Sequence, residues 1–192
     1  SDLYYGALRC NDPPPATSPP DLVDTIAECY PGSATVEMSD GAVKRMNQLQ
    51  LGDVVKATSG AFSEVYFFSH RKESGMHDFI RLASSETSDV LEVSPGHLVY
   101  ANGKLVAANK VLIGDTLNRG DGSEVSVSTI EKVVLQGLYH PHTMQGDIVV
   151  NGFRTSGYTT AVAAPLAHVA LAPLRALHVL GVFVPQFLNE DA

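Results

Sequence analysis

Polar and apolar residues alternate along most of the chain between residues 29 and 160, as in residues 33–38, "SATVEM". Alternation with a period of two is typical of a half-buried β-strand. Turns containing glycine separate these runs at short intervals, at residues 39–42 ("SDGA"), 101–104 ("ANGK") and 119–124 ("RGDGSE"). Many short alternating runs joined by such turns predict an all-β domain over residues 29–160.

The first part of the chain departs from this pattern. Residues 1–28 contain the run "DPPPATSPPD", which favours an extended chain and cannot form a core. We therefore interpret residues 1–28 as a tether, the end of an upstream segment that leads into the β-domain.

The last part, residues 161–192, is rich in alanine and leucine. Its apolar residues recur near helical spacing, among them Leu166, Val169, Leu174 and Leu177. Pro173 can begin a helix but interrupts a continuous one, so we expect two short apolar helices with a break at Pro173. A helix that is apolar on most faces needs a cover, which is either its own domain or a lipid.

Charge and composition exclude some classes of partner. The formal net charge is −8, which leaves no basic stripe to attract nucleic acid. No apolar run reaches the ~18 residues that indicate a membrane span, and the first ten residues show no secretory signal. The two cysteines, Cys10 and Cys29, predict no dependence on disulfides. His140 and His142 lack the further ligands of a structural metal site, so we expect no metal.

Cys29 lies at the junction of the tether and the β-domain, in the stretch "AECYPGSATV". Pro31 restricts Tyr30, and Gly32 allows a tight turn, so this junction is held in place. A cysteine there can attack the carbonyl carbon of Glu28 and convert the Glu28–Cys29 amide into a thioester. That reaction needs a strained linkage, a proton donor for the departing nitrogen and a stabilised oxyanion. The alternative role of Cys29 is packing as a small apolar residue.

His97 and Ser94 are the candidates to assist that step, in the stretch "VSPGHLVY" between two strand-like runs. A histidine can protonate the amide nitrogen, and a serine can donate to an oxyanion or steady the distorted bond. His70, in "FFSHRK", also follows an apolar run and can point into a cleft. The alternative for each histidine is a surface position or a hydrogen-bonded place in the core.

Together these motifs resemble those of a known family. "CYPGSATV" is similar to the opening of the hedgehog autoprocessing domain, the Hint module shared with inteins, which has phenylalanine where Tyr30 stands. "LQLGDVV" and "GLYHPHTMQGDIVVNGFRTSGYT" resemble later motifs of that domain, and "VSPGHLVY" resembles its Thr-x-x-His motif, with Ser94 in the threonine position. "LAHVALAPLRALHVLG" resembles the start of the sterol-recognition region of hedgehog proteins. The resemblance implies a Hint fold of two pseudo-symmetric β-subdomains with a short C-terminal helical appendage.

The resemblance also implies a single-turnover reaction of the chain on itself, in two steps. In the first step Cys29 is the nucleophile of an N-to-S acyl shift, which His97 assists and Ser94 supports. In the second step a sterol hydroxyl attacks the thioester, and the segment upstream of the Glu28–Cys29 bond is released as an ester. Residues 29–160 would be the autoprocessing domain.

The implied partners are the upstream segment and a sterol or other lipid, which takes part as a co-substrate. The resemblance implies no cofactor. Residues 161–192 would be a lipid-recognition tail, able to approach a membrane surface, and the family implies the secretory pathway or the extracellular space. The sterol contacts expected in this tail are Leu166, Val169, Leu174 and Leu177.

Three positions depart from the family pattern. His70 stands where hedgehog proteins usually have the aspartate thought to activate the sterol hydroxyl, although histidine can also act as a base near neutral pH. Gly157 replaces a second cysteine, and Glu28 replaces the glycine before the nucleophile. Hydrolysis of the thioester, or an inactive module that only binds lipid or a partner, therefore remain alternatives to lipid transfer.

Overall fold

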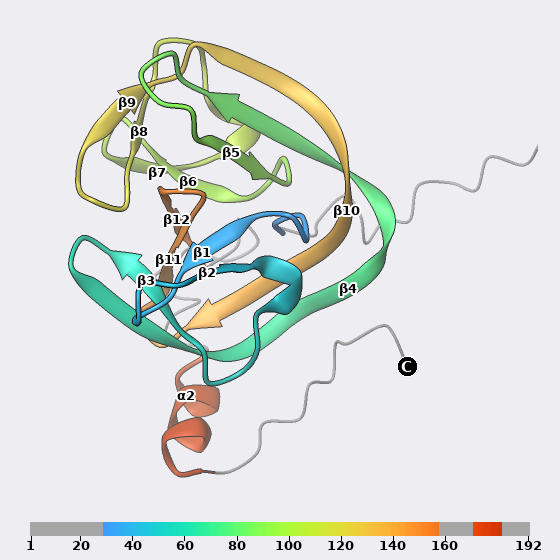
Figure 1. Ribbon diagram of the computed structural model, residues 1–192, viewed down its shortest axis with the longest axis vertical. Helices are drawn as coiled ribbons and strands as arrows, with labels where there is room; N and C mark the ends of the chain where they lie inside the picture. The colour runs from blue at the N-terminus through green and yellow to red at the C-terminus, as the bar shows by residue number, and fades with distance from the viewer. Residues whose placement is uncertain (1–28, 158–170, 182–192) are drawn as a thin grey trace, which may run out of the picture.

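The computed structural model describes residues 29–157 and 171–181, and within them the chain is mostly β-strand (Figure 1). The strands are β1 (Thr35–Glu37), β2 (Val43–Arg45), β3 (Val54–Thr58), β4 (Ala61–Ala83), β5 (Val90–Val93), β6 (Leu98–Ala101), β7 (Lys104–Ala107), β8 (Thr116–Asn118), β9 (Glu124–Ser126), β10 (Thr129–Thr143), β11 (Asp147–Val150) and β12 (Phe153–Ser156). Two short 3-10 helices, η1 (Met46–Gln48) and η2 (Ala108–Lys110), interrupt them, and α2 spans Ala172–Val179. The prediction of an all-β domain with a short C-terminal helix is confirmed.

The described strands form two sheets. One runs in the order β2-β1-β11-β12-β6-β8-β9, with β7 paired to β6, and the other runs β10-β4-β3, with β5 paired to β4. The long antiparallel strands β4 and β10 curve along one side of the molecule and reach both halves (Figure 1). Strands β5 to β9 lie in one half and β1 to β3 in the other.

The two halves repeat the same local structure, as the pseudo-symmetry predicted for the fold requires. Each has a 3-10 helix followed by a tight turn that an aspartate closes. The backbone N–H of Gln50 donates to Asp53 Oδ2 at 2.8 Å, and the N–H of Leu112 donates to Asp115 Oδ2 at 2.8 Å. A short aspartate side chain that caps the backbone three residues earlier stabilises such a turn.

A second pair of residues follows the same repeat. Asn102 and Asn151 have positive φ angles of 51° and 49°, which asparagine tolerates better than most residues. Asn102 Oδ1 accepts a hydrogen bond from the N–H of Thr116 at 2.9 Å, and Asn151 Oδ1 accepts one from the N–H of Thr35 at 2.7 Å. Each asparagine thereby ties a hairpin turn to a neighbouring strand.

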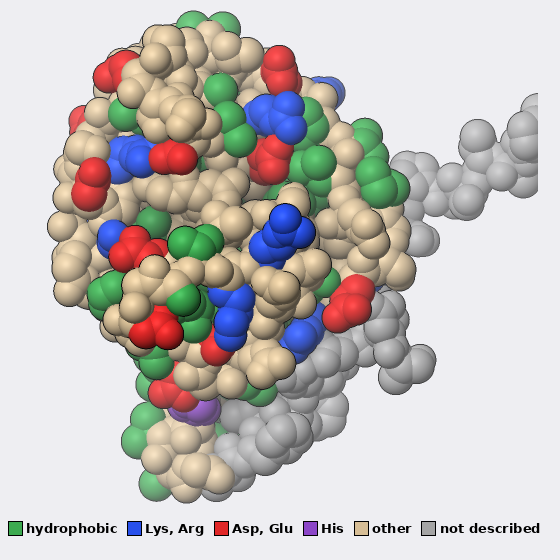
Figure 2. Space-filling view, viewed as in Figure 1, with side chains coloured by type: hydrophobic (Ala, Val, Ile, Leu, Met, Phe, Trp, Pro, Cys, Tyr) green, Lys and Arg blue, Asp and Glu red, His purple; other side chains and the backbone are tan. Residues whose placement is uncertain are grey.

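The main core contains large apolar side chains from both halves, among them Tyr30, Phe68, Leu82, Leu91, Ile148 and Phe153. Lysine, arginine, aspartate and glutamate side chains are interspersed over the face shown in Figure 2. Several of them pair, as Lys56 does with Glu37 at 2.8 Å. That face therefore carries charges of both signs side by side.

Helix α2 packs against the edge of the β-domain through few contacts. Leu174 contacts a small cluster around Tyr66 and Phe67, and His178 Nε2 lies 2.8 Å from Glu64 Oε1. Pro173 is the second residue of α2, so the helix begins one residue before the proline at which we expected a break. None of its residues is buried, and no described helix is long and apolar enough to cross a membrane.

Some of the predictions for the two ends fall on residues that the structure does not describe. The tether at residues 1–28 and the second helix expected before Pro173 lie outside the described residues, as do Leu166 and Val169. Of the other two expected sterol contacts, Leu174 is partly buried and Leu177 is 38% exposed.

Candidate active site

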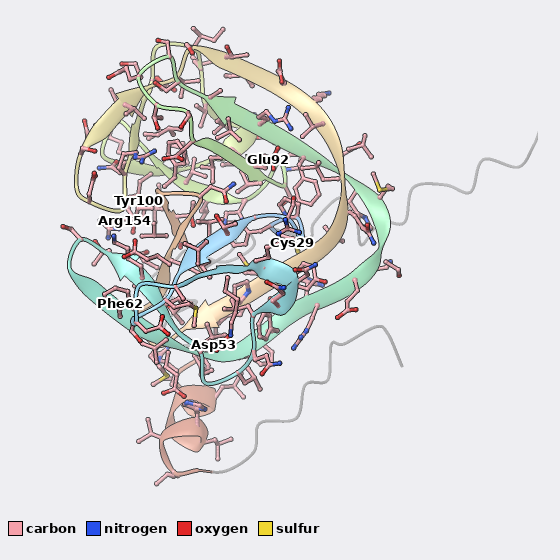
Figure 3. All side chains as sticks on the ribbon, viewed as in Figure 1. Cys29, Asp53, Phe62, Glu92, Tyr100 and Arg154 are labelled. Carbon is pink, nitrogen blue, oxygen red and sulfur yellow. The ribbon has the colours of Figure 1, made fainter. Side chains whose placement is uncertain are left out.

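Cys29 is fully buried at the start of the β-domain (Figure 3). Its side chain belongs to a small apolar cluster with Phe79 and Leu138. The next residue, Tyr30, forms an isolated antiparallel bridge with Tyr139 of β10, with backbone N–O distances of 2.8 and 3.0 Å. Strand β10 therefore holds the chain on the C-terminal side of Cys29 in one position.

Ser94 binds the backbone of Cys29 twice. The N–H of Cys29 donates to Ser94 Oγ at 2.7 Å, and the N–H of Ser94 donates to the carbonyl oxygen of Cys29 at 2.9 Å. Ser94 is 2% exposed and follows directly after β5, 65 residues along the chain from Cys29. The nitrogen that Ser94 binds is the nitrogen of the Glu28–Cys29 bond, although Glu28 itself lies outside the described residues.

His97 is fully buried in the tight turn that Ser94 begins. Its N–H donates to the carbonyl oxygen of Ser94 at 3.0 Å, and its ring lies 4.3 Å from the ring of Tyr30 between centroids. Nε2 of His97 is 3.1 Å from the carbonyl oxygen of Ser156. Because a carbonyl oxygen only accepts, Nε2 carries the proton, and Nδ1 is the nitrogen that can gain and release one.

His70 lies on β4 and is partly buried. Its partner in the antiparallel register is His140 of β10. Directly opposed residues of an antiparallel pair project to the same face, with Cβ atoms about 5 Å apart. The structure thus places His70 beside another histidine and one strand away from the Cys29 junction.

His140 and His142 are two site residues that sequence analysis set aside. Both are buried, and their rings stack with centroids 4.5 Å apart. His140 Nε2 lies 3.1 Å from the carbonyl oxygen of Gly157, and His142 Nε2 lies 2.9 Å from Ser69 Oγ. The spacing of two residues on a strand already indicates a shared face. It does not indicate that the face is buried.

Burial and mutual repulsion keep these two imidazoles neutral. Burial, followed by the neighbouring His142, His97 and His70, holds the pKa of His140 well below its ordinary value. Burial, followed by His70 and His97, lowers the pKa of His142 to about 4. Burial also raises the pKa of the Tyr30 hydroxyl, which bonds to Thr155 Oγ1 at 2.6 Å. Both His140 and His142 are therefore neutral at neutral pH.

The arrangement can support attack on the bond before Cys29. It brings together a buried thiol, a hydroxyl on the backbone nitrogen that would leave, and an imidazole with a fixed tautomer three residues after that hydroxyl in the same turn. Among residues 29–157 and 171–181, no group of three or more histidine, cysteine, aspartate or glutamate side chains is arranged to hold a metal ion.

Comparison with known proteins identifies the family. The Hint module family matches residues 21–191 of this chain. The chain is 30% identical over 181 residues to Protein hedgehog of Drosophila virilis, covering 85% of this chain and 37% of that protein. It is 33% identical over 141 residues to Warthog protein 6 of Caenorhabditis elegans, covering 66% of this chain and 23% of that protein. The chain therefore spans well under half the length of these curated relatives.

Solved structures share the fold. The gp41-1 intein superposes with a TM-score of 0.59 at 14% identity, covering 67% of this chain and 98% of the intein. At so low an identity this likeness shows the fold alone. Because the family match covers most of the chain, and hedgehog relatives and an intein fold agree with it, the chain belongs to the Hint module family as a self-processing domain of the hedgehog type, related to inteins.

Proposed function

We propose that this domain cuts its own chain at the Glu28–Cys29 bond by an N-to-S acyl shift. The observation that supports this most is the 2.7 Å hydrogen bond from the Cys29 nitrogen to Ser94 Oγ. It fixes the nitrogen that must leave, and the bridge between Tyr30 and Tyr139 fixes the residue after it. Holding the reacting groups in one geometry is a large part of the catalysis of such an intramolecular step.

In this step the Cys29 sulfur forms a bond to the Glu28 carbonyl carbon and the carbon–nitrogen bond breaks. The thiol loses its proton and the departing nitrogen gains one. Because the proton on Nε2 is held by the Ser156 carbonyl, Nδ1 of His97 would take up the thiol proton and pass it to that nitrogen. Ser94 keeps the nitrogen oriented as its bond to Glu28 lengthens.

The thioester would then pass the upstream segment to a hydroxyl group, and we propose a sterol or another lipid as its source. The run that contains α2 resembles the start of a sterol-recognition region, and α2 leaves Leu177, Val179 and Leu180 exposed. His70 would accept the proton of that hydroxyl. We also propose that the protein belongs to the secretory pathway, a location that suits a transfer to lipid.

Hydrolysis of the thioester is the second candidate, because a histidine stands at position 70 where hedgehog proteins usually have aspartate. Water and a sterol hydroxyl would use the same base. Both candidates require the first step, whereas an inactive module that only binds lipid or a partner does not.

The test follows the fate of the full 192-residue chain with and without dithiothreitol. Thiol should release the upstream peptide from the wild type, and Cys29→Ala should abolish release. Cys10→Ala is the matched control, and its release should equal that of the wild type. Mass spectrometry of the peptide formed with cholesterol in detergent micelles then separates an ester from a free acid. A wild-type chain that stays intact under all these conditions would refute the acyl shift.

A further inference from the structure

His140 lies among the rings of His97 and His142, and the first step does not use it. It is 1% exposed, its ring stacks on His142, and its ring centroid is 5.7 Å from that of His97. Fully buried polar side chains are uncommon in a sheet unless they have a structural or chemical task. The burial of both His140 and His142 on β10 therefore points to such a task.

Toward β4, His140 faces His70. The two residues are direct partners in the antiparallel register, and the register then shifts, so that Pro141 pairs with Phe68. Ser69 is the extra residue of this β-bulge, and its hydroxyl lies 2.9 Å from His142 Nε2. Bulges often re-aim side chains at functional sites. Here the bulge brings Ser69 and His70 of β4 against His140 and His142 of β10.

Toward the cleavage site, His140 and His97 are oriented by consecutive carbonyl groups. His97 Nε2 donates to the carbonyl oxygen of Ser156, and His140 Nε2 donates to that of Gly157 at 3.1 Å. Both rings therefore keep Nδ1 as the nitrogen able to accept a proton. The two ring centroids are 5.7 Å apart, so these imidazoles are direct neighbours in one buried cluster.

We propose that His140 is a proton relay of the second step, which passes the proton of the attacking hydroxyl from His70 toward His97 and Cys29. This inference rests on the proposed function, since it concerns the thioester that the first step forms. His140 would carry a proton between His70, which is the base, and the Cys29 sulfur. It would not contact the molecule whose hydroxyl attacks the thioester.

The proton balance of the second step requires such a transfer. The hydroxyl oxygen forms a bond to the Glu28 carbonyl carbon, the carbon–sulfur bond breaks, and the hydroxyl proton moves to His70. The departing Cys29 sulfur must gain a proton to end as a thiol. His70 lies on β4, whereas Cys29 contacts Leu138 and the turn at Ser94. His140 lies between them, two residues after Leu138 on β10.

The protonation state of His140 fits a relay. Its pKa is held well below the ordinary value by burial and by the neighbouring histidines, so the ring is neutral at neutral pH. Its Nε2 proton is held by the Gly157 carbonyl, so Nδ1 would both receive the transferred proton and give it up, and burial keeps the protonated ring short-lived.

The experiment separates attack by sulfur from attack by oxygen on the same thioester. Dithiothreitol attacks as a thiolate and needs no base in the site. Cholesterol and water both must lose a proton. In His140→Gln, whose amide can still donate to the Gly157 carbonyl, release by oxygen nucleophiles should slow at least about tenfold while thiol-induced release is unchanged. His140→Leu should show the same split.

His77→Gln is the matched control. His77 is also a buried histidine, but it lies on β4 opposite Leu135 and not opposite another histidine. It should leave both rates unchanged. Equal loss of both rates in His140→Gln would show that His140 is only structural. Unchanged oxygen-dependent release would overturn the relay, as would a wild type that releases peptide with thiol alone. That last result would leave the acyl shift intact, whereas absence of thiol-induced release would refute the proposed function itself.

Discussion

Cys29 and Ser94 are joined by two hydrogen bonds that run in opposite directions between segments 65 residues apart. The Cys29 nitrogen donates to the Ser94 hydroxyl, and the Ser94 nitrogen donates to the Cys29 carbonyl. A backbone pair of this kind resembles one rung of a β-ladder in which a side chain replaces one carbonyl. The hydroxyl therefore occupies the place from which it can act on the amide nitrogen.

Replacing Ser94 tests the value of this contact. Ser94→Ala should slow thiol-induced release about five- to tenfold, because a hydrogen bond to the leaving nitrogen contributes about 1 kcal/mol. Ser94→Thr keeps the hydroxyl and is the residue of the hedgehog motif, so its release rate should stay near that of the wild type. The measurement is the rate of peptide release with dithiothreitol on denaturing gels. If alanine and threonine behave alike, the hydroxyl has no part in the first step.

A change at Tyr30 should lower the free energy of unfolding without stopping thiol-induced release. Its hydroxyl donates at 2.6 Å to Thr155 Oγ1, which itself donates to the Ile148 carbonyl at 3.0 Å. Tyr30→Phe leaves Thr155 with one hydrogen bond fewer in a fully buried site and should lower the free energy of unfolding by about 1 kcal/mol. Thiol-induced release should persist, since phenylalanine is the residue of the family motif at this position.

Urea denaturation of Cys29→Ala variants, which cannot process, gives the free energy of unfolding. The control is Thr155→Val, which removes the other partner. The double variant should cost less than the sum of the two single changes, because the two residues share one interaction. A strictly additive result would show that the Tyr30 hydroxyl is not bonded to Thr155 in solution.

The alternation of polar and apolar residues was sufficient to predict strands and turns, but not their length. The polar stretch "KESG" at residues 72–75 interrupts the alternation, yet it lies inside the single strand β4. The reason is tertiary, since β10 pairs with β4 on both sides of residues 73–75, and its register shifts between Gln136 and Leu138 where it passes them. Gly75, at φ +87°, lies within this strand without ending it.

For the candidate site, too, the sequence predicted some residues and missed others. Cys29, Ser94 and His97 were visible because local motifs carry them, and the structure places all three at one junction. His140 and His142 were not, because their burial depends on a bulge in β4 and on the carbonyl groups that follow β12. Periodicity within β10 shows that two histidines share a face, but only the pairing of distant strands shows what covers that face.

The neutral state of His142 predicts a loss of stability in mild acid. Its pKa is about 4 in the folded protein, against ~6.5 in an unfolded chain, so the unfolded state binds more protons between these values. The free energy of unfolding should therefore fall as the pH drops from about 6.5 to about 4, by on the order of 3 kcal/mol from this group. His140, whose pKa is also lowered, adds to the effect.

Urea denaturation at several pH values measures this, again in the Cys29→Ala background. Carboxylates titrate in the same range, so the informative quantity is the difference between the parent and His142→Leu. The parent should lose more stability than the variant on acidification, because leucine cannot take up a proton. Parallel curves for the two proteins would mean that His142 is already charged or exposed when folded.

Removal of the helical tail should separate the two steps of the reaction. In the described part of the chain, the hydrogen bonds that join Cys29, Ser94 and His97 to their partners lie within residues 29–156, so deletion of residues 161–192 should leave thiol-induced release unchanged. Transfer to cholesterol, measured as the ester by mass spectrometry, should be lost. Because deletion also uncovers Tyr66 and Phe67, the point variant Leu177→Asp is a milder companion that keeps the Leu174 contact. A charge on this exposed face should reduce ester formation alone. Loss of thiol-induced release in both proteins would show instead that the tail is part of the folded core.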